Sequence, residues 1–197
     1  MILGRGMGLT VLALVASAAV DCTSAPARFY TLNSTATPSG APMTHASVMI
    51  GAVSVPAAVD QPQFVVEVAS NRLQVDEFDR WAAPLNDGIA HAVAGDLAAL
   101  LGTPDVAAAP FANFDPAYTV TIEVQRFASI PGEAAVIEAV WTVHKTAGGE
   151  TRSGRSAARE PVQGDSREAL AAAHSRALAQ LSGDIAGAIR AEAQMKP

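Results

Sequence analysis

The chain has 197 residues, of which 50% are hydrophobic and 16% are charged, and its formal net charge is −6. This length is typical of one domain, whose core is large enough to be stable without disulfides or a structural metal. An acidic chain without a basic stripe is not typical of a nucleic-acid-binding protein, so we expect no nucleic-acid partner.

The first 21 residues have the pattern of a signal peptide. Arg5 supplies a positive charge, and residues 9–20 (LTVLALVASAAV) form a mainly apolar segment. This segment is shorter than the roughly 20 apolar residues that a membrane-spanning helix needs. The pattern therefore predicts export of the chain and removal of residues 1–21.

Cys22, the only cysteine, directly follows this segment. A lone cysteine cannot form an intramolecular disulfide, but a cysteine at this place is the lipid attachment point of bacterial lipoproteins. Ala19 and Asp21 depart from the usual lipoprotein signal, which has a Leu-like residue three before the cysteine and Gly or Ala directly before it. We expect lipid attachment at Cys22, and the alternative is ordinary cleavage after residues 16–18 that leaves Cys22 unmodified.

The region after the cysteine has a different composition from the rest. Residues 29–32 (FYTL) are a short β-type patch, and residues 33–46 are rich in Ser, Thr, Ala and Pro without a hydrophobic period. Such a composition is typical of a linker. We expect residues 22–46 to be a lipid-anchored flexible tether and residues 47–193 to form the folded domain.

Alternating and continuous apolar runs predict the strands of that domain. The expected strands are residues 48–55, 64–69, 72–75, 106–108, 118–127, 134–145 and 151–159. Gly148 and Gly149 predict a tight turn between strands 134–145 and 151–159, so these two strands should pair antiparallel. Asp76, Glu77 and Asp79 are expected to form a solvated acidic corner after the third strand.

Two helices complete the predicted fold. The first begins at Pro84 and ends at Gly102, with apolar residues every three or four positions. His91 and Asp96 lie off this apolar stripe, and we expect both to be solvated. The second helix covers residues 166–193. Together the elements predict a single α+β domain with an antiparallel-rich sheet packed against two main helices.

No motif in the chain is arranged for catalysis. The four histidines lack metal-ligand spacing, and the chain has no phosphate-binding glycine loop and no serine-nucleophile motif. Arg152, Arg155 and Arg159 lie on one strand; they favour a charged edge strand over a phosphate or lipid-headgroup site, which is the alternative. We therefore expect no catalytic residue, no metal site and no cofactor.

Arg80 and Trp81 directly precede the first helix. A Trp between a charged loop and a helix start is typical of a packing anchor, and Trp and Arg are also the residues that dominate protein interfaces. The pair is therefore expected to be either a structural anchor or a partner-docking site.

With these segments identified, the chain resembles the ABC-type transport auxiliary lipoprotein family, the PqiC-like subunits of intermembrane lipid transport. The resemblance rests on Cys22 followed by residues 29–32, on residues 55–63 (VPAAVDQPQ), on residues 80–85 (RWAAPL), and on the closing strands with a long C-terminal helix. The two middle motifs are the most specific, because they occur in this order at a family-like distance.

The resemblance implies a non-catalytic periplasmic subunit that works beside an MCE-domain protein and an ABC permease and ATPase. It implies a membrane link through the lipid on Cys22, and Thr23 after the cysteine suits the outer membrane. A homo-oligomer is compatible with this interpretation. The alternative from another class is a secreted soluble ligand-binding domain with no transport partner, and a hydrolytic enzyme is a third, less favoured one.

Overall fold

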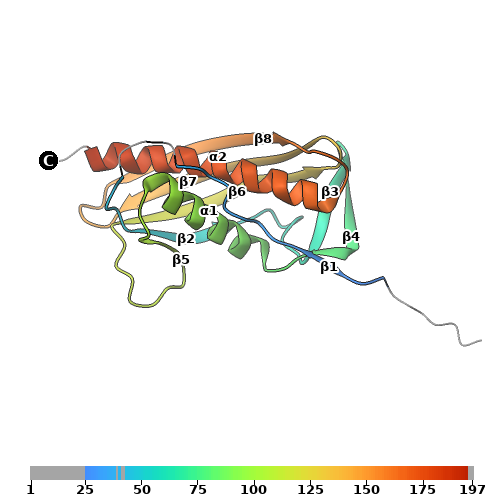
Figure 1. The fold of residues 1–197 in the computed structure, drawn as a ribbon, viewed down its shortest axis with the longest axis horizontal. Helices are drawn as coiled ribbons and strands as arrows, with labels where there is room; N and C mark the ends of the chain where they lie inside the picture. Colours follow the sequence, from blue (N-terminus) through green and yellow to red (C-terminus); the bar gives the residue numbers. More distant parts are fainter. Residues whose placement is uncertain (1–24, 39, 41–42, 195–197) are drawn as a thin grey trace, which may run out of the picture.

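A five-stranded mixed sheet in the order β5-β2-β6-β7-β8 forms one layer of the protein (Figure 1). The computed structural model describes residues 25–38, 40 and 43–194. The long strands β6, β7 and β8 form an antiparallel meander, whereas β2 is parallel to both of its neighbours. The strands are β2 (Val48–Ser54), β5 (Val106–Ala108), β6 (Tyr118–Ile130), β7 (Ala134–Lys145) and β8 (Thr151–Pro161).

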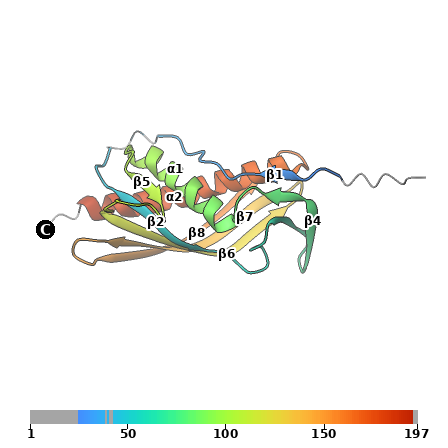
Figure 2. The ribbon, with the colours of Figure 1, turned by 90° about the horizontal axis from the view of Figure 1, so that it is seen from below.

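Two helices, α1 (Leu85–Leu101) and α2 (Arg167–Gln194), lie side by side on one face of this sheet (Figure 2). The helix α1 contacts β2 and β5, and α2 contacts β7 and β8. Gly102 ends α1 in the left-handed conformation at φ 67°, where a side chain would be strained. The apolar stripe of α1 is buried as its period predicts. In the described part of the chain, neither helix is long and apolar enough to cross a membrane.

Close packing between β7 and β8 explains a glycine in the middle of a strand. A Cβ on Gly154 would lie 2.2 Å from the ring of Trp141, so only glycine leaves room for the indole. The indole N–H of Trp141 donates to Ser156 Oγ at 3.0 Å. Ser156 Oγ in turn donates to Asp184 on α2, so the buried indole has its polar group satisfied on the helix-covered face.

A second, three-stranded sheet in the order β1-β4-β3 lies at one end of the first (Figure 1). Its strands are β1 (Arg28–Tyr30), β3 (Gln63–Ala69) and β4 (Arg72–Trp81). The strands β3 and β4 contain the predicted strands 64–69 and 72–75 and form a hairpin, but β4 continues to Trp81. The strand β1 pairs with β4 in parallel. The fold is thus the predicted α+β class with two helices, but its strands are divided between two sheets.

The expectation of a free tether is wrong for residues 28–36, because this segment packs on the domain. After β1, residues 31–36, which we call the strap, run over the two helices. Asn33 N–H donates to Ser175 Oγ on α2 at 3.1 Å, and Thr35 N–H donates to Asp96 on α1 at 2.8 Å. A Cβ on Gly95 would lie 2.8 Å from Ser34 Cβ, which shows how closely the strap approaches α1.

The expectation that Asp96 is solvated is also wrong. Its side chain is fully buried, and its carboxylate accepts hydrogen bonds from the strap and from Ser182 on α2. The strap donors are Ser34 Oγ and the amide N–H groups of Thr35 and Ala36, all within 2.9 Å. A buried carboxylate is stable only when its oxygens are bonded in this way. His91, in contrast, is exposed as expected.

Candidate functional site

The two most specific sequence motifs meet at one cleft. Gln63, which ends the first motif, pairs with Arg80 across the β3–β4 ladder, and the Trp81 N–H donates to Pro62 O at 2.8 Å. Between them lies a cleft of about 340 Å³. Its lining residues are Asp60, Gln61, Pro62, Trp81, Ala82, Ala83, Pro84 and Leu85. Segments twenty residues apart in the sequence therefore form one surface.

A second cleft of about 290 Å³ lies on the other side of Ala83. Its walls are Tyr30 from β1, Thr31 and Leu32 from the strap, and the first turns of α1 up to His91. Residues 82–84, which we call the ridge, are exposed, and Ala83 among them lines both clefts. Because the walls are mainly apolar and the openings face solvent, the pair of clefts is suited to receive apolar side chains of another molecule.

Trp81 forms the common floor of the two clefts. Its side chain is 7% exposed, and its ring stacks on Phe64 with a centroid distance of 4.5 Å and an interplanar angle of 25°. Phe127 meets it edge-on at 6.0 Å. Arg80 lies next to Trp81 in the strand, so its side chain points to the opposite face of the small sheet. The Arg80–Trp81 pair is thus split between the core and the outside.

The expected acidic corner is part of β4, and the structure corrects the expectation that Asp79 is solvated. Asp79 is 4% exposed and accepts two hydrogen bonds from the Arg28 guanidinium, at 2.7 and 2.8 Å, and one from Tyr30 Oη at 2.7 Å. Burial alone would raise the pKa of Asp79, but the bonds from Arg28 and Tyr30 outweigh it and hold this pKa below its ordinary value. Burial and the same bond raise the pKa of Tyr30 to about 12. This cluster fixes β1, and with it one wall of the second cleft.

A buried serine–histidine pair lies under the small sheet, which the sequence did not predict. Ser129 Oγ on β6 is 2.8 Å from His174 Nε2 on α2, and the imidazole stacks on Phe127 at 3.9 Å. Burial lowers the pKa of His174 to about 3, so the ring is neutral.

Among the described residues, none offers His174 Nδ1 a hydrogen bond. Buried N–H groups are rarely left unpaired, so the proton belongs on Nε2, which donates to Ser129. A histidine that donates to the serine and lacks an orienting acid does not have the arrangement of a catalytic triad. The pair is best described as a hydrogen bond of the core.

The other candidate residues are not brought together. Arg152 pairs with Glu192 at 3.5 Å and Arg159 pairs with Glu133, on opposite faces of the edge strand β8, while Arg155 is exposed. Within the described ranges, no group of three or more His, Cys, Asp or Glu side chains is placed to hold a metal ion. Cys22 lies outside the described residues.

The fold and the clefts define a small α+β domain with an N-terminal strap and a surface suited to binding a partner. The model of the ABC-type transport auxiliary lipoprotein component family matches residues 30–186. The chain therefore belongs to this family of auxiliary components of ABC transport systems, and a lipoprotein component is associated with the cell envelope. The match includes the strap and both motifs at the cleft. A search of curated proteins gave no match.

Solved structures share the fold at low sequence identity. A protein from Xanthomonas campestris superposes with a TM-score of 0.71 at 23% identity, covering 86% of this chain and 100% of its own. An uncharacterized protein superposes with a TM-score of 0.67 at 19% identity, covering 84% of this chain and 99% of its own. PelC from Paraburkholderia phytofirmans, a dodecamer, gives a TM-score of only 0.40 at 13% identity, covering 76% of this chain and 88% of its own. At these identities the first two likenesses bear on the fold alone.

Proposed function

We propose that the protein is a non-catalytic periplasmic lipoprotein subunit of an ABC transport system of the MCE type, which carries lipids between membranes. The single observation that carries this proposal is the family match over residues 30–186, which describes an auxiliary lipoprotein component. The energy for transport then comes from a separate ATPase. This chain contributes a folded surface that docks on the MCE-domain protein.

The two clefts around residues 82–84 supply that surface. They combine the exposed ridge with an apolar floor at Trp81, and aromatic residues are enriched at the centres of protein interfaces. The Asp79 cluster and the Asp96 bonds hold the walls in place before a partner arrives. A preformed surface of this kind loses little conformational entropy on binding.

The proposed signal peptide ends at residue 21, and Cys22 carries the lipid that attaches the protein to the outer membrane. Stable attachment needs more than one acyl chain, because each buried CH₂ contributes only about 0.8 kcal/mol. Cys22→Ser should therefore release the protein into the soluble periplasmic fraction. Mass spectrometry of the N-terminal peptide gives the direct measurement. A soluble wild-type protein with an unmodified Cys22 would show that Asp21 prevents lipoprotein processing.

Affinity purification of the full chain from solubilised cell envelopes tests the partner. We expect an MCE-domain protein, with its permease and ATPase, to co-purify in amounts comparable to the bait. The alternative, a secreted soluble ligand-binding domain, predicts that no transport subunit is recovered and that a small molecule occupies one of the clefts, which native mass spectrometry detects.

A further inference from the structure

We propose that the outer face of the small sheet, formed by Phe29, Phe78 and Arg80, lies against the phospholipid surface of the membrane that holds the protein. We call this surface the outer aromatic face. The proposed orientation depends on the lipid attachment at Cys22 proposed above, and it specifies which side of the domain faces the bilayer. The cleft residues and the core contacts do not use these three side chains.

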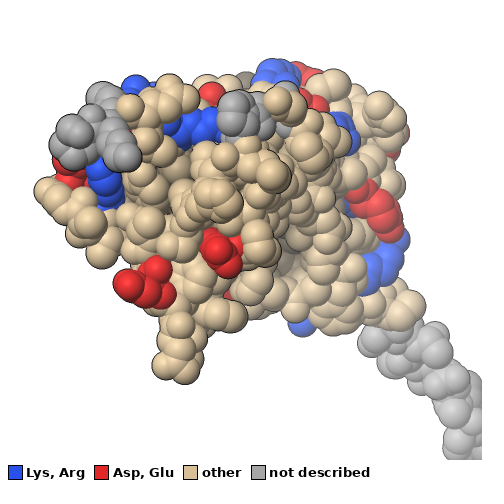
Figure 3. All heavy atoms as spheres, turned by 60° about the vertical axis from the view of Figure 1, so that its left-hand side comes forward, with Lys and Arg blue, Asp and Glu red and all other residues tan. Residues whose placement is uncertain are grey.

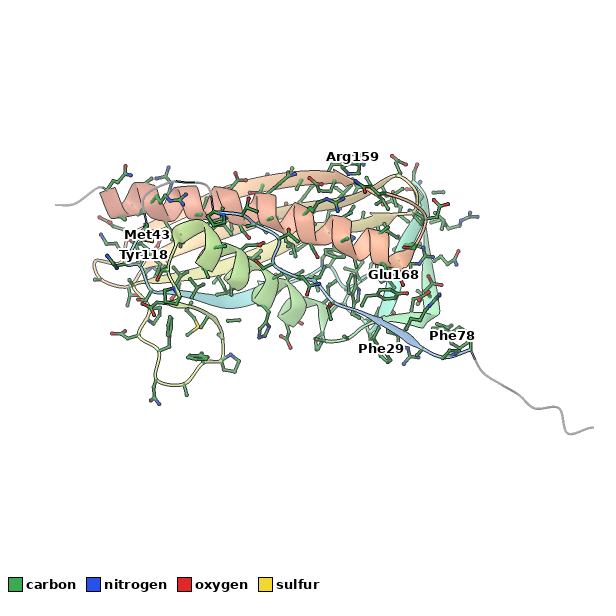
Figure 4. All side chains as sticks on the ribbon, viewed as in Figure 1. Phe29, Met43, Phe78, Tyr118, Arg159 and Glu168 are labelled. Atoms are coloured by element: carbon green, nitrogen blue, oxygen red, sulfur yellow. The ribbon has the colours of Figure 1, made fainter. Side chains whose placement is uncertain are left out.

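The geometry of β1 and β4 puts the three residues on one face. Asp79 and Trp81 point inward, so Phe78 and Arg80, which alternate with them, point outward. Phe29 is paired with Arg80 in the β1–β4 ladder and lies on the same side. The phenylalanines are 63% and 46% exposed, values that are unusual for rings of this size. Figure 4 shows both at the end of the molecule where the described chain begins.

Arg80 adds a positive charge on the same face, opposite Phe29 in the ladder and two residues after Phe78 in β4. Its Nε–H donates to the backbone oxygen of Glu77 at 3.2 Å, and within the described residues it forms no ion pair with a carboxylate. A partly exposed guanidinium on the same face as two aromatic rings fits an interface where rings enter the headgroup region and the cation meets anionic phosphate. A purely apolar protein partner would leave this charge unpaired at high cost.

The length of the chain before β1 keeps this face near the membrane. Cys22 precedes Phe29 by seven residues, and seven residues span at most about 25 Å when fully extended. A domain of this size is about 40 Å across. The outer aromatic face therefore belongs to the part of the domain that a lipid on Cys22 holds closest to the bilayer.

Phe111 offers a matched control. Its ring is 60% exposed, similar to Phe29, but it lies in the loop between β5 and β6, which is at the other end of the molecule (Figure 1). If exposed rings contact lipid without preference, Phe111 should do so as readily as Phe29. If the chain is oriented as proposed, only the rings beside β1 should reach the bilayer.

Photo-crosslinking of the full-length acylated protein tests this orientation. The variants Phe29→p-benzoylphenylalanine, Phe78→p-benzoylphenylalanine and Phe111→p-benzoylphenylalanine are each reconstituted on vesicles of phosphatidylethanolamine and phosphatidylglycerol and irradiated. We expect phospholipid adducts at positions 29 and 78 in a yield several times that at position 111. Leaving out phosphatidylglycerol, or adding Arg80→Gln, should lower the yield at both positions.

Equal yields at all three positions, or adducts at 29 and 78 with a second copy of the chain, would overturn the inference. The mass of the Cys22 peptide in the same samples separates this failure from that of the proposed function. An acylated protein without lipid adducts contradicts the orientation alone, whereas an unmodified Cys22 contradicts the lipoprotein attachment and the orientation together.

Discussion

Trp81 and Arg80 are neighbours in the sequence, yet they serve opposite sides of β4. Trp81 is held between Phe64 and Phe127 and closes the floor of both clefts. Arg80 is partly exposed on the outer face. Trp81 therefore packs in the core, whereas the side chain of Arg80 is accessible on the surface.

Trp81→Ala should lower the free energy of unfolding by about 3–5 kcal/mol, because it removes a buried ring and leaves a cavity beside Phe64. Arg80→Ala is the control, and a substitution on the surface should change stability by less than about 0.5 kcal/mol. Urea denaturation of the two variants measures both values. Equal stability of Trp81→Ala and the wild type would contradict the placement of the ring in the core.

His174 should make the folded state sensitive to acid. Burial lowers its pKa to about 3 in the folded protein, whereas the unfolded chain takes up the proton near pH 6.5. The unfolded state thus binds more protons between these values, so the contribution of His174 is complete above about pH 6.5 and is lost as the pH falls. From pH 7 to pH 5 the loss should be about 2 kcal/mol.

Urea denaturation at several pH values, with His174→Gln as the variant, measures this loss. The variant should lose about 2 kcal/mol less than the wild type over the same pH interval. His91→Gln, at an exposed position on α1, is the control for the substitution itself. Parallel curves for the wild type and His174→Gln would show that His174 does not titrate as a buried group.

The strap is the element that the sequence could not identify. Its composition is that of a linker, and its order comes from partners far along the chain: Asp96 on α1 and Ser175 on α2. No local pattern shows that a polar residue off the helix stripe will accept bonds from a segment sixty residues earlier. Gly95, beside Asp96, gave the one available signal, since glycine within a helix permits close approach of another backbone.

Asp96→Ala should detach the strap and destabilise the domain by about 2–4 kcal/mol, because three strap donors and Ser182 lose a charged acceptor. Hydrogen exchange of the Thr35 and Ala36 amides should accelerate strongly. Asp87→Ala, on an exposed position of the same helix, is the matched control and should leave both amides protected. Protection that persists in Asp96→Ala would contradict the assignment of these bonds.

The pairing of β1 with β4 was missed for a related reason. The acidic residues at the end of β4 suggested a solvated corner, but β1 supplies Arg28 and Tyr30 to neutralise Asp79. The long strands β6 and β7 and both helices, by contrast, were predicted close to their observed bounds because each carries its own hydrophobic period. Hydrophobic periodicity thus predicts the helices and strands that bury one face. The positions of the strap and of β1 depend instead on polar contacts with residues far along the chain, which no local pattern predicts.

In the whole molecule, the outer aromatic face and the clefts are separated from the loop between β5 and β6. The strands β1 and β4, which carry the outer aromatic face and contribute Tyr30 and Trp81 to the clefts, lie near the end at which the described chain begins (Figure 1). The loop between β5 and β6 projects at the other end. On the face shown in Figure 3, few charged side chains are present over a broad central area. This arrangement fits a subunit held at one end by lipid and engaged beside that end by a protein partner.

Blocking the clefts tests the proposed docking most directly. Ala83 is exposed and lines both clefts, so Ala83→Arg places a long charged side chain between them without removing any core contact. Ala112→Arg, on the exposed loop between β5 and β6, adds the same side chain at the other end of the molecule and is the matched control. The amount of MCE-domain protein that co-purifies with each variant from cell envelopes is the measurement. We predict that Ala83→Arg loses most of the partner while keeping the wild-type melting temperature, and that Ala112→Arg retains it; equal recovery with both variants would contradict docking through the clefts.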